Sequence, residues 1–119
     1  MESPRYTSEY EEWFTSQDEE AKVLINAKVL VLKEFGPNLG RPYVDTIKGS
    51  KYKNLKELRI THKKYVLRIL FIFNKKRNCW FLIGGNKKGK NEEDFYESLV
   101  KIAEKLLDKY PEILEEKGA

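Results

Sequence analysis

The 119-residue chain is poor in the residues that build metal centres and covalent cross-links. Its one cysteine, Cys79, cannot form an internal disulfide, and with one histidine, His62, it argues against a zinc site of cysteine and histidine ligands. No apolar run approaches the roughly 18 residues of a membrane helix, and the N-terminus lacks a signal-peptide pattern. These shortages predict a cytoplasmic protein with no metal, no other cofactor and no membrane partner.

Apolar and charged side chains are plentiful. They make up 40% and 35% of the residues, which predicts one sizeable core beneath a heavily solvated surface. The length suits a single domain, residues 1–119.

Acidic side chains are nearly absent from the middle of the chain. Residues 36–90 hold 15 basic and 2 acidic side chains, whereas residues 1–35 hold 4 and 8 and residues 91–119 hold 4 and 9. Concentrated positive charge suits a polyanion, because each neutralised phosphate releases counterions. Lysines that merely keep a small protein soluble are the alternative, but the scarcity of acids in the same segment favours a nucleic acid.

The N-terminal third predicts two helices. Ser8 and Glu11 have the spacing of a capping box, and Asp18 can cap a second helix. The pair Gly36-Pro37 ends that helix, which favours a helix over a strand for VLVL at 29–32. The residues of the second helix expected to face the core are Val23, Leu24, Ala27, Leu30, Val31 and Phe35.

The remainder predicts a sheet covered by a last helix, and thus an α+β fold. Residues 36–54 form a loop, and strands follow at 55–62, 65–73 and 79–83, with the apolar YVLRILFIF segment in the centre. Short connections make this an antiparallel meander of three to four strands. Asn91 caps the C-terminal helix. The apolar stripe of that helix is Phe95, Leu99, Ile102, Ala103, Leu106 and Leu107.

Arg68 interrupts the central apolar strand, where an unpaired charge would be costly. Either Glu57 on the adjacent strand neutralises it, or the arginine opens onto a concave face and meets an anion. Both can hold at once, because a carboxylate can orient an arginine toward a phosphate.

Three segments resemble the HigB branch of the RelE/ParE toxin superfamily: LGRPYVDTIKGSKYKNLKELR, YVLRILFIF, and LIGGNKKGKN followed by FYE. The similarity extends from about Tyr10 to about Leu107. It implies a compact RelE-like toxin of a type II toxin–antitoxin module, a metal-independent endoribonuclease that cleaves mRNA, usually on the ribosome. It also implies a helix-turn-helix, HigA-like antitoxin as partner, through which any DNA binding would occur.

The resemblance assigns roles to individual residues. Arg68 corresponds to the strand arginine at the scissile phosphate, Lys87 to a basic residue after the third strand, and Tyr96 to a tyrosine that acts as base or stacks on a nucleotide. Arg59 and Lys56 fall near the basic pair of the preceding strand, so that one sheet face would hold Lys56, Arg59 and Arg68 as cations. A tyrosine pKa is ordinarily about 10, so a base role requires nearby cations. The residues expected to contact RNA are Lys51, Lys53, Lys56, Lys88, Lys90 and His62.

Several alternatives stay open. Tyr96 can simply pack on the last helix, and His62 can be a solvated residue at a hairpin end. The acidic C-terminal segment departs from toxins that place a histidine or arginine there, which leaves the general acid unassigned. A ParE-type toxin that inhibits DNA gyrase and a non-catalytic RNA-binding module are the alternative functions.

Overall fold

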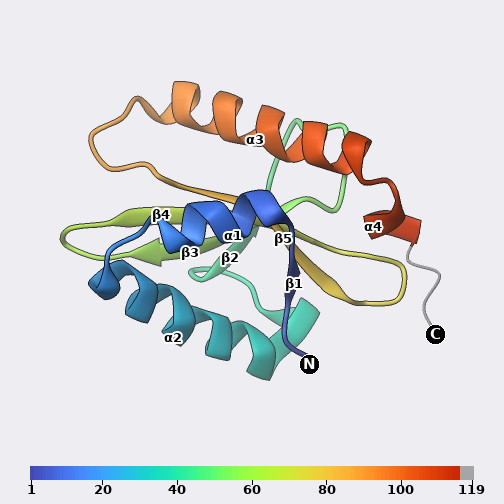
Figure 1. The fold of residues 1–119 in the computed structure, drawn as a ribbon, viewed down its shortest axis with the longest axis horizontal. Coiled ribbons are helices and arrows are strands. Elements are labelled where there is room, and N and C mark those ends of the chain that lie inside the picture. Colours follow the sequence, from blue (N-terminus) through green and yellow to red (C-terminus); the bar gives the residue numbers. More distant parts are fainter. Residues whose placement is uncertain (116–119) are drawn as a thin grey trace.

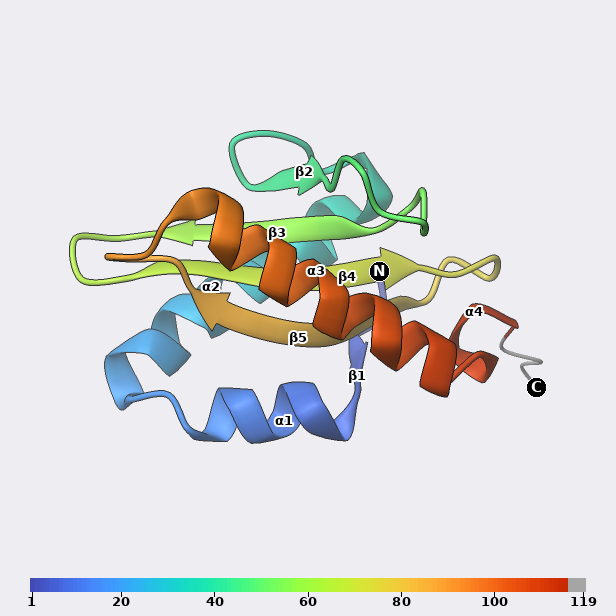
Figure 2. The same cartoon turned by 90° about the horizontal axis from the view of Figure 1, so that it is seen from above.

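The computed structural model describes residues 1–115; residues 116–119, which the single-domain prediction includes, lie outside the described residues. One sheet separates two helical layers, with α1 and α2 against one face and α3 against the other (Figures 1 and 2). The predicted α+β class and the two N-terminal helices are confirmed.

The sheet has five strands in the order β1-β5-β4-β3-β2. Strand β1 runs parallel to β5, and the other neighbours are antiparallel. The three central strands were predicted, whereas β1 and β2 were missed because two or three residues are too few to show alternation. The strands are β1 (Arg5–Tyr6), β2 (Val44–Thr46), β3 (Lys56–Thr61), β4 (Val66–Phe73) and β5 (Cys79–Asn86).

Helix α1 (Ser8–Thr15) begins at the residue predicted to be its N-cap, so the observed N-cap lies one residue earlier. Thr7, not Ser8, is the N-cap: its hydroxyl accepts a hydrogen bond from the amide of Tyr10 at 3.0 Å and donates one to the carbonyl of Leu82 at 2.7 Å. The Ser8 hydroxyl instead bonds the carboxylate of Glu9. Thr7 forms the cap because its hydroxyl is hydrogen-bonded to both the helix and the sheet.

Helix α2 (Glu19–Phe35) is capped by Asp18, as predicted, but buries a different face. The fully buried residues are Ala21, Ile25 and Leu32, whereas Val23, Leu30 and Phe35 are exposed. The segment is apolar on most sides, so its periodicity does not select one face; packing against β3 does. A short 3-10 helix, η1 (Gly36–Asn38), follows it.

Helix α3 (Glu92–Lys109) has the predicted Asn91 cap and buries the predicted stripe except for Ile102, which is exposed. A single turn, α4 (Glu112–Glu115), follows after Pro111. Two cores result, one between the sheet and α1/α2 and one between the sheet and α3. Within residues 1–115, no helix has the length and apolar character needed to cross a membrane.

Two glycines of β5 allow helices to approach the sheet closely from both sides. A Cβ on Gly84 would lie 2.4 Å from the Trp13 ring of α1, and one on Gly85 would lie 3.0 Å from the Phe95 ring of α3. Gly85 is also paired with Arg68 on β4. Because these two glycines have no side chains, α1 and α3 can lie close to β5 and to the neighbouring strand β4.

We expect Gly84→Ala to lower the free energy of unfolding by about 1–3 kcal/mol, because the added methyl overlaps a ring packed between two elements. Urea denaturation monitored by tryptophan fluorescence measures the loss. Gly40→Ala is the control, since a methyl added at that position would have no neighbour within 4 Å. Equal midpoints for the two variants would contradict the close-approach argument.

Candidate functional site

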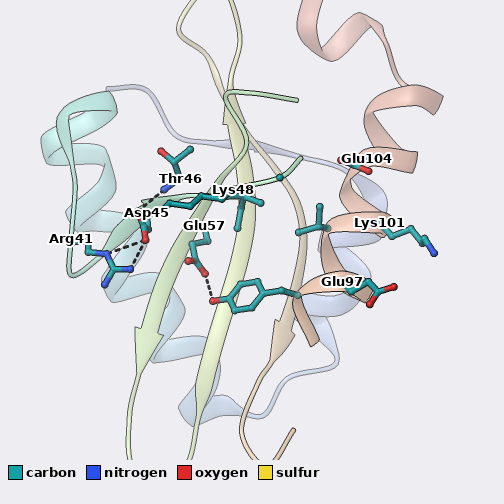
Figure 3. Close-up of a pocket in the computed structure, with 12 residues that line it drawn as sticks. Arg41, Asp45, Thr46, Lys48, Glu57, Glu97, Lys101 and Glu104 are labelled. Carbon is teal, nitrogen blue, oxygen red and sulfur yellow. Dashed lines mark hydrogen bonds and ion pairs between the residues drawn. The ribbon is translucent and has the colours of Figure 1, made fainter. Parts of the chain in front are cut away.

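A pocket of about 540 Å³ opens between α3 and the segment containing β2 (Figure 3). The chain from Arg41 to Gly49 forms one wall, and α3 from Tyr96 to Glu104 forms the other. Glu57 reaches the pocket from β3, between the two walls. The pocket thus joins three elements that are distant in sequence, and its lining mixes cationic and anionic side chains.

Two residues that line this pocket, Glu57 and Tyr96, form a polar network with the buried Arg68. The Tyr96 hydroxyl donates to Oε1 of Glu57 at 2.5 Å and accepts from Nε of Arg68 at 3.1 Å. Arg68 Nε also lies 3.4 Å from the same carboxylate oxygen. Strand alternation places Glu57 and Arg68 on the α3 face of the sheet, where α3 brings Tyr96 over them.

Arg68 does not open onto the surface. Its side chain is 2% exposed, it is paired with Glu57, and Nη1 donates to the carbonyl of Leu67 at 2.9 Å. The expectation that this guanidinium lies on a concave, solvent-reachable face is therefore wrong, and the ion-pair interpretation is confirmed. An arginine inside a core needs such a partner, since an isolated buried charge is strongly unfavourable.

Tyr96 keeps its proton at neutral pH. The pKa of its phenol is raised to about 12, first by burial and then by the hydrogen bond to Glu57, which together outweigh the lowering effect of Arg68. The condition set for a base role, nearby cations that lower the pKa of this phenol, is therefore not met. The phenol is a hydrogen-bond donor with an anionic acceptor beside it.

Arg59 and Lys87 lie around the same network. Arg59 is directly opposite Arg68 in the strand register and is half-buried. The Lys87 ammonium is 2.7 Å from Oε1 of Glu92 and 5.5 Å from the centre of the Tyr96 ring. The pKa of Glu92 is lowered chiefly by the Lys87 hydrogen bond, with smaller contributions from Arg68 and Arg59. These cations therefore share one region.

Lys56 is not part of that face. It alternates with Glu57 along β3 and lies on the same side as Leu58, facing the α1/α2 layer. The predicted grouping of Lys56 with Arg59 and Arg68 on one sheet face is therefore wrong. A register uncertainty of one residue transfers a side chain to the opposite face.

Lys51 is held far from the network. Its ammonium is 2.7 Å from Oδ2 of Asp108, and the Tyr52 hydroxyl donates to the same carboxylate. The Ser50 hydroxyl donates to Glu104 at 2.7 Å. Asp108 lies twelve residues beyond Tyr96 on α3, about 18 Å along the helix axis. These contacts fasten the loop that carries Lys51 and Lys53 to α3.

The remaining predicted RNA contacts lie on loops. The Lys88 ammonium donates to the carbonyl of Lys63, which joins the loop after β5 to the β3–β4 turn. Lys90 lies 5.8 Å from the Phe95 ring centre. His62 accepts a hydrogen bond from the Lys64 amide in that turn and is half-buried. The structure thus brings Lys88 near the turn of His62 but places neither in the pocket lining.

Of the twelve residues that line the pocket, Tyr96 was among the predicted site residues and the other eleven were not; the missed charged side chains include Arg41, Lys48, Glu57 and Lys101. Arg41 binds Asp45 through Nε at 3.0 Å and Nη2 at 2.6 Å. The signal for Glu57 was available in the sequence, because it is one of two acids among residues 36–90 and lies on the strand beside Arg68. No comparable signal marked Lys101, whose place depends on how α3 docks.

Comparison with known proteins gives a consistent set of relatives. Residues 12–108 match the family described as Phage derived protein Gp49-like (DUF891). The chain is 40% identical over 95 residues to a candidate toxin of Mycobacterium tuberculosis named HigB2, covering 79% of this chain and 47% of that protein. It is 36% identical over 94 residues to a second candidate toxin, HigB3, covering 79% of this chain and 80% of that protein. The chain therefore spans about half of HigB2.

The fold resembles a toxin of known structure. A chain in the crystal structure of the RelB–RelE antitoxin–toxin complex from Methanococcus jannaschii aligns with a TM-score of 0.57 and 12% identity. The alignment covers 79% of this chain and 96% of that chain. At this identity the likeness establishes the fold, and the predicted RelE-like architecture is confirmed.

The buried ion pair predicts that Arg68 contributes more to the free energy of unfolding than Arg59, which faces it on the adjacent strand. We expect Arg68→Met to lower the free energy of unfolding by about 3–5 kcal/mol, because it leaves the Glu57 carboxylate buried without its cation. Arg59→Met, the matched control on the adjacent strand, should cost about 1 kcal/mol or less, because Arg59 is half-buried and the carboxylates that feel its charge, Asp45 and Glu92, reach solvent. Urea denaturation measures both.

Adding Glu57→Gln to Arg68→Met should recover much of that lost stability, because the double variant has no charge at either buried position. A double variant as unstable as the sum of the singles would show that the pair is not energetically coupled.

Proposed function

The chain belongs to the Gp49-like (DUF891) family, and from this premise we propose that it is the toxin of a type II toxin–antitoxin module, an endoribonuclease that cleaves mRNA on the ribosome. The observation that carries the proposal is the pocket itself, where the Glu57 carboxylate and the Tyr96 phenol lie side by side; Arg59 and Lys87 lie near this pair, outside the pocket lining. The relatives named as candidate toxins and the RelE-like fold support it.

Arg59 and Lys87 are the proposed phosphate ligands. RNA cleavage by the 2′-hydroxyl builds negative charge on the phosphate, and fixed cations stabilise that charge most when they are already in place. Lys87 is paired with the exposed carboxylate of Glu92, which a phosphate can replace as its partner at little cost. Lys88, Lys90, Lys53 and His62 are proposed to contact RNA outside the pocket. The chemistry uses side chains and requires no metal ion.

Arg68 has an indirect role in this proposal. With its guanidinium 2% exposed, it acts through the Glu57 and Tyr96 side chains that it holds, rather than as a phosphate ligand. It is thus a positioning residue. An action on ribosomes also places the protein in the cytoplasm.

We expect Arg59→Ala and Lys87→Ala each to slow cleavage of ribosome-bound mRNA by roughly 10²-fold, because each removes a cation that stabilises the transition state. The rate is measured by mapping new 5′ ends in a reconstituted translation mixture. Lys75→Ala is the matched control: it removes the same charge from the turn after β4, seven residues, or about 23 Å, along the strand from Arg68.

Three outcomes would count against the proposal. Equal slowing by Lys75→Ala would show that Arg59→Ala and Lys87→Ala slow cleavage only by lowering the net positive charge. Intact mRNA that is nevertheless bound by the wild-type protein would favour a non-catalytic RNA-binding module. Inhibition of DNA gyrase supercoiling without RNA cleavage would favour the ParE-type alternative.

The proposed partner is a HigA-like, helix-turn-helix antitoxin. RelE was solved with its antitoxin RelB, and by analogy we propose that an antitoxin silences this chain, either by covering the basic region or by blocking entry to the ribosome. Any DNA binding would then reside in the complex through the antitoxin.

We expect induction of the wild-type chain to arrest bacterial growth and coexpression of its antitoxin to restore it. Colony counts after induction measure both effects. Arg59→Ala should arrest growth more weakly than the wild type, and Lys75→Ala should match it. Normal growth of cells that accumulate soluble wild-type protein would count against the toxin assignment.

A further inference from the structure

The Glu57–Tyr96 pair has the chemistry of a proton acceptor and a proton donor facing one pocket. Both residues line the pocket, and their oxygens are 2.5 Å apart. A carboxylate accepts protons readily, whereas a phenol with a raised pKa holds its proton until a stronger base develops beside it. Since both groups face one pocket and their oxygens share a hydrogen bond, the carboxylate suits the acceptor role and the phenol the donor role.

We propose that Glu57 is the general base and Tyr96 the general acid of the cleavage reaction, and that their hydrogen bond resets the site after each turnover. The proposal rests on the endoribonuclease function. From the sequence, Glu57 has no role beyond neutralising Arg68, and Tyr96 is expected to act as base or to stack on a nucleotide.

The proton and bond changes balance. Glu57 takes the proton of the 2′-hydroxyl as that oxygen forms a bond to phosphorus. The bond from phosphorus to the 5′-oxygen breaks, and Tyr96 gives its proton to the departing oxygen. The products are a 2′,3′-cyclic phosphate and a free 5′-hydroxyl. Protonated Glu57 then returns its proton to the Tyr96 phenolate along the bond between them.

Arg68 makes this return possible without joining the chemistry. Its Nε lies 3.1 Å from the Tyr96 oxygen and 3.4 Å from the Glu57 oxygen, so the cation faces both atoms that carry negative charge during the cycle. Because 2% of the side chain is exposed, water competes little for it. The arginine thus stabilises whichever partner is ionised.

The test uses two mRNAs on programmed ribosomes, identical except that one has sulfur in place of the 5′-bridging oxygen at the cleaved bond. A thiolate is a far better leaving group than an alkoxide, since thiols ionise near pH 8.5, and it does not need a proton from the enzyme. Wild-type protein should cut both mRNAs.

Tyr96→Phe should cut the oxygen substrate about 10²- to 10⁴-fold more slowly than the wild type and the sulfur substrate at nearly the wild-type rate. Glu57→Gln should be slow on both, because attack by the 2′-hydroxyl still lacks its base. Glu112→Gln, the same chemical change in an exposed carboxylate of α4 outside the pocket lining, is the control and should resemble the wild type.

Equal slowing of Tyr96→Phe on both substrates would overturn the acid assignment, and full-rate cleavage by Glu57→Gln would overturn the base assignment. Tyr96→Phe removes one hydroxyl and leaves the Glu57–Arg68 ion pair, so its result stands even where Glu57→Gln unfolds. A wild-type protein that cuts neither mRNA would instead refute the endoribonuclease function on which the proposal rests.

Discussion

The central constraint of this structure is a charged guanidinium inside an apolar sheet. Arg68 lies on β4 between two strands and beneath α3, so it must be neutralised within the protein. Glu57 provides the charge and Tyr96 the remaining hydrogen bond. The same three contacts that make burial tolerable also fix α3 on the sheet. Fold stability and site geometry therefore depend on one interaction, and a change in either partner affects both.

The uneven charge of the sequence is partly balanced when the chain folds. Cations of the central segment pair with acids of both flanks: Lys64 with Glu20, Lys51 with Asp108 and Lys87 with Glu92. Such exposed pairs contribute about 0–1 kcal/mol each, so a polyanion with several phosphates can compete for these lysines. The positive field is thus reduced in the free protein and available when a stronger anion arrives.

Local signals in the sequence were reliable where one physical effect decides the outcome. Asp18 and Asn91 cap helices, and the central strand is apolar on both faces, because capping and burial act over a few residues. The buried face of α2 was misassigned because a helix that is apolar on most sides has several faces that could pack on the core. Short edge strands give no periodicity. The Glu57–Arg68 pair was among the alternatives, but the depth of Arg68 depends on α3, which lies some thirty residues further along the chain.

The pocket is assembled from segments far apart in the chain, with walls at 41–49 and 96–104 and the sheet between them. Strand β1 pairs with β5 across 75 residues, from Arg5 to Trp80. Since a chain leaves the ribosome N-terminal end first, the pocket wall at 41–49 cannot meet Tyr96 until α3 has emerged. The pocket therefore forms only after the whole sheet has been synthesised, and α3 completes it.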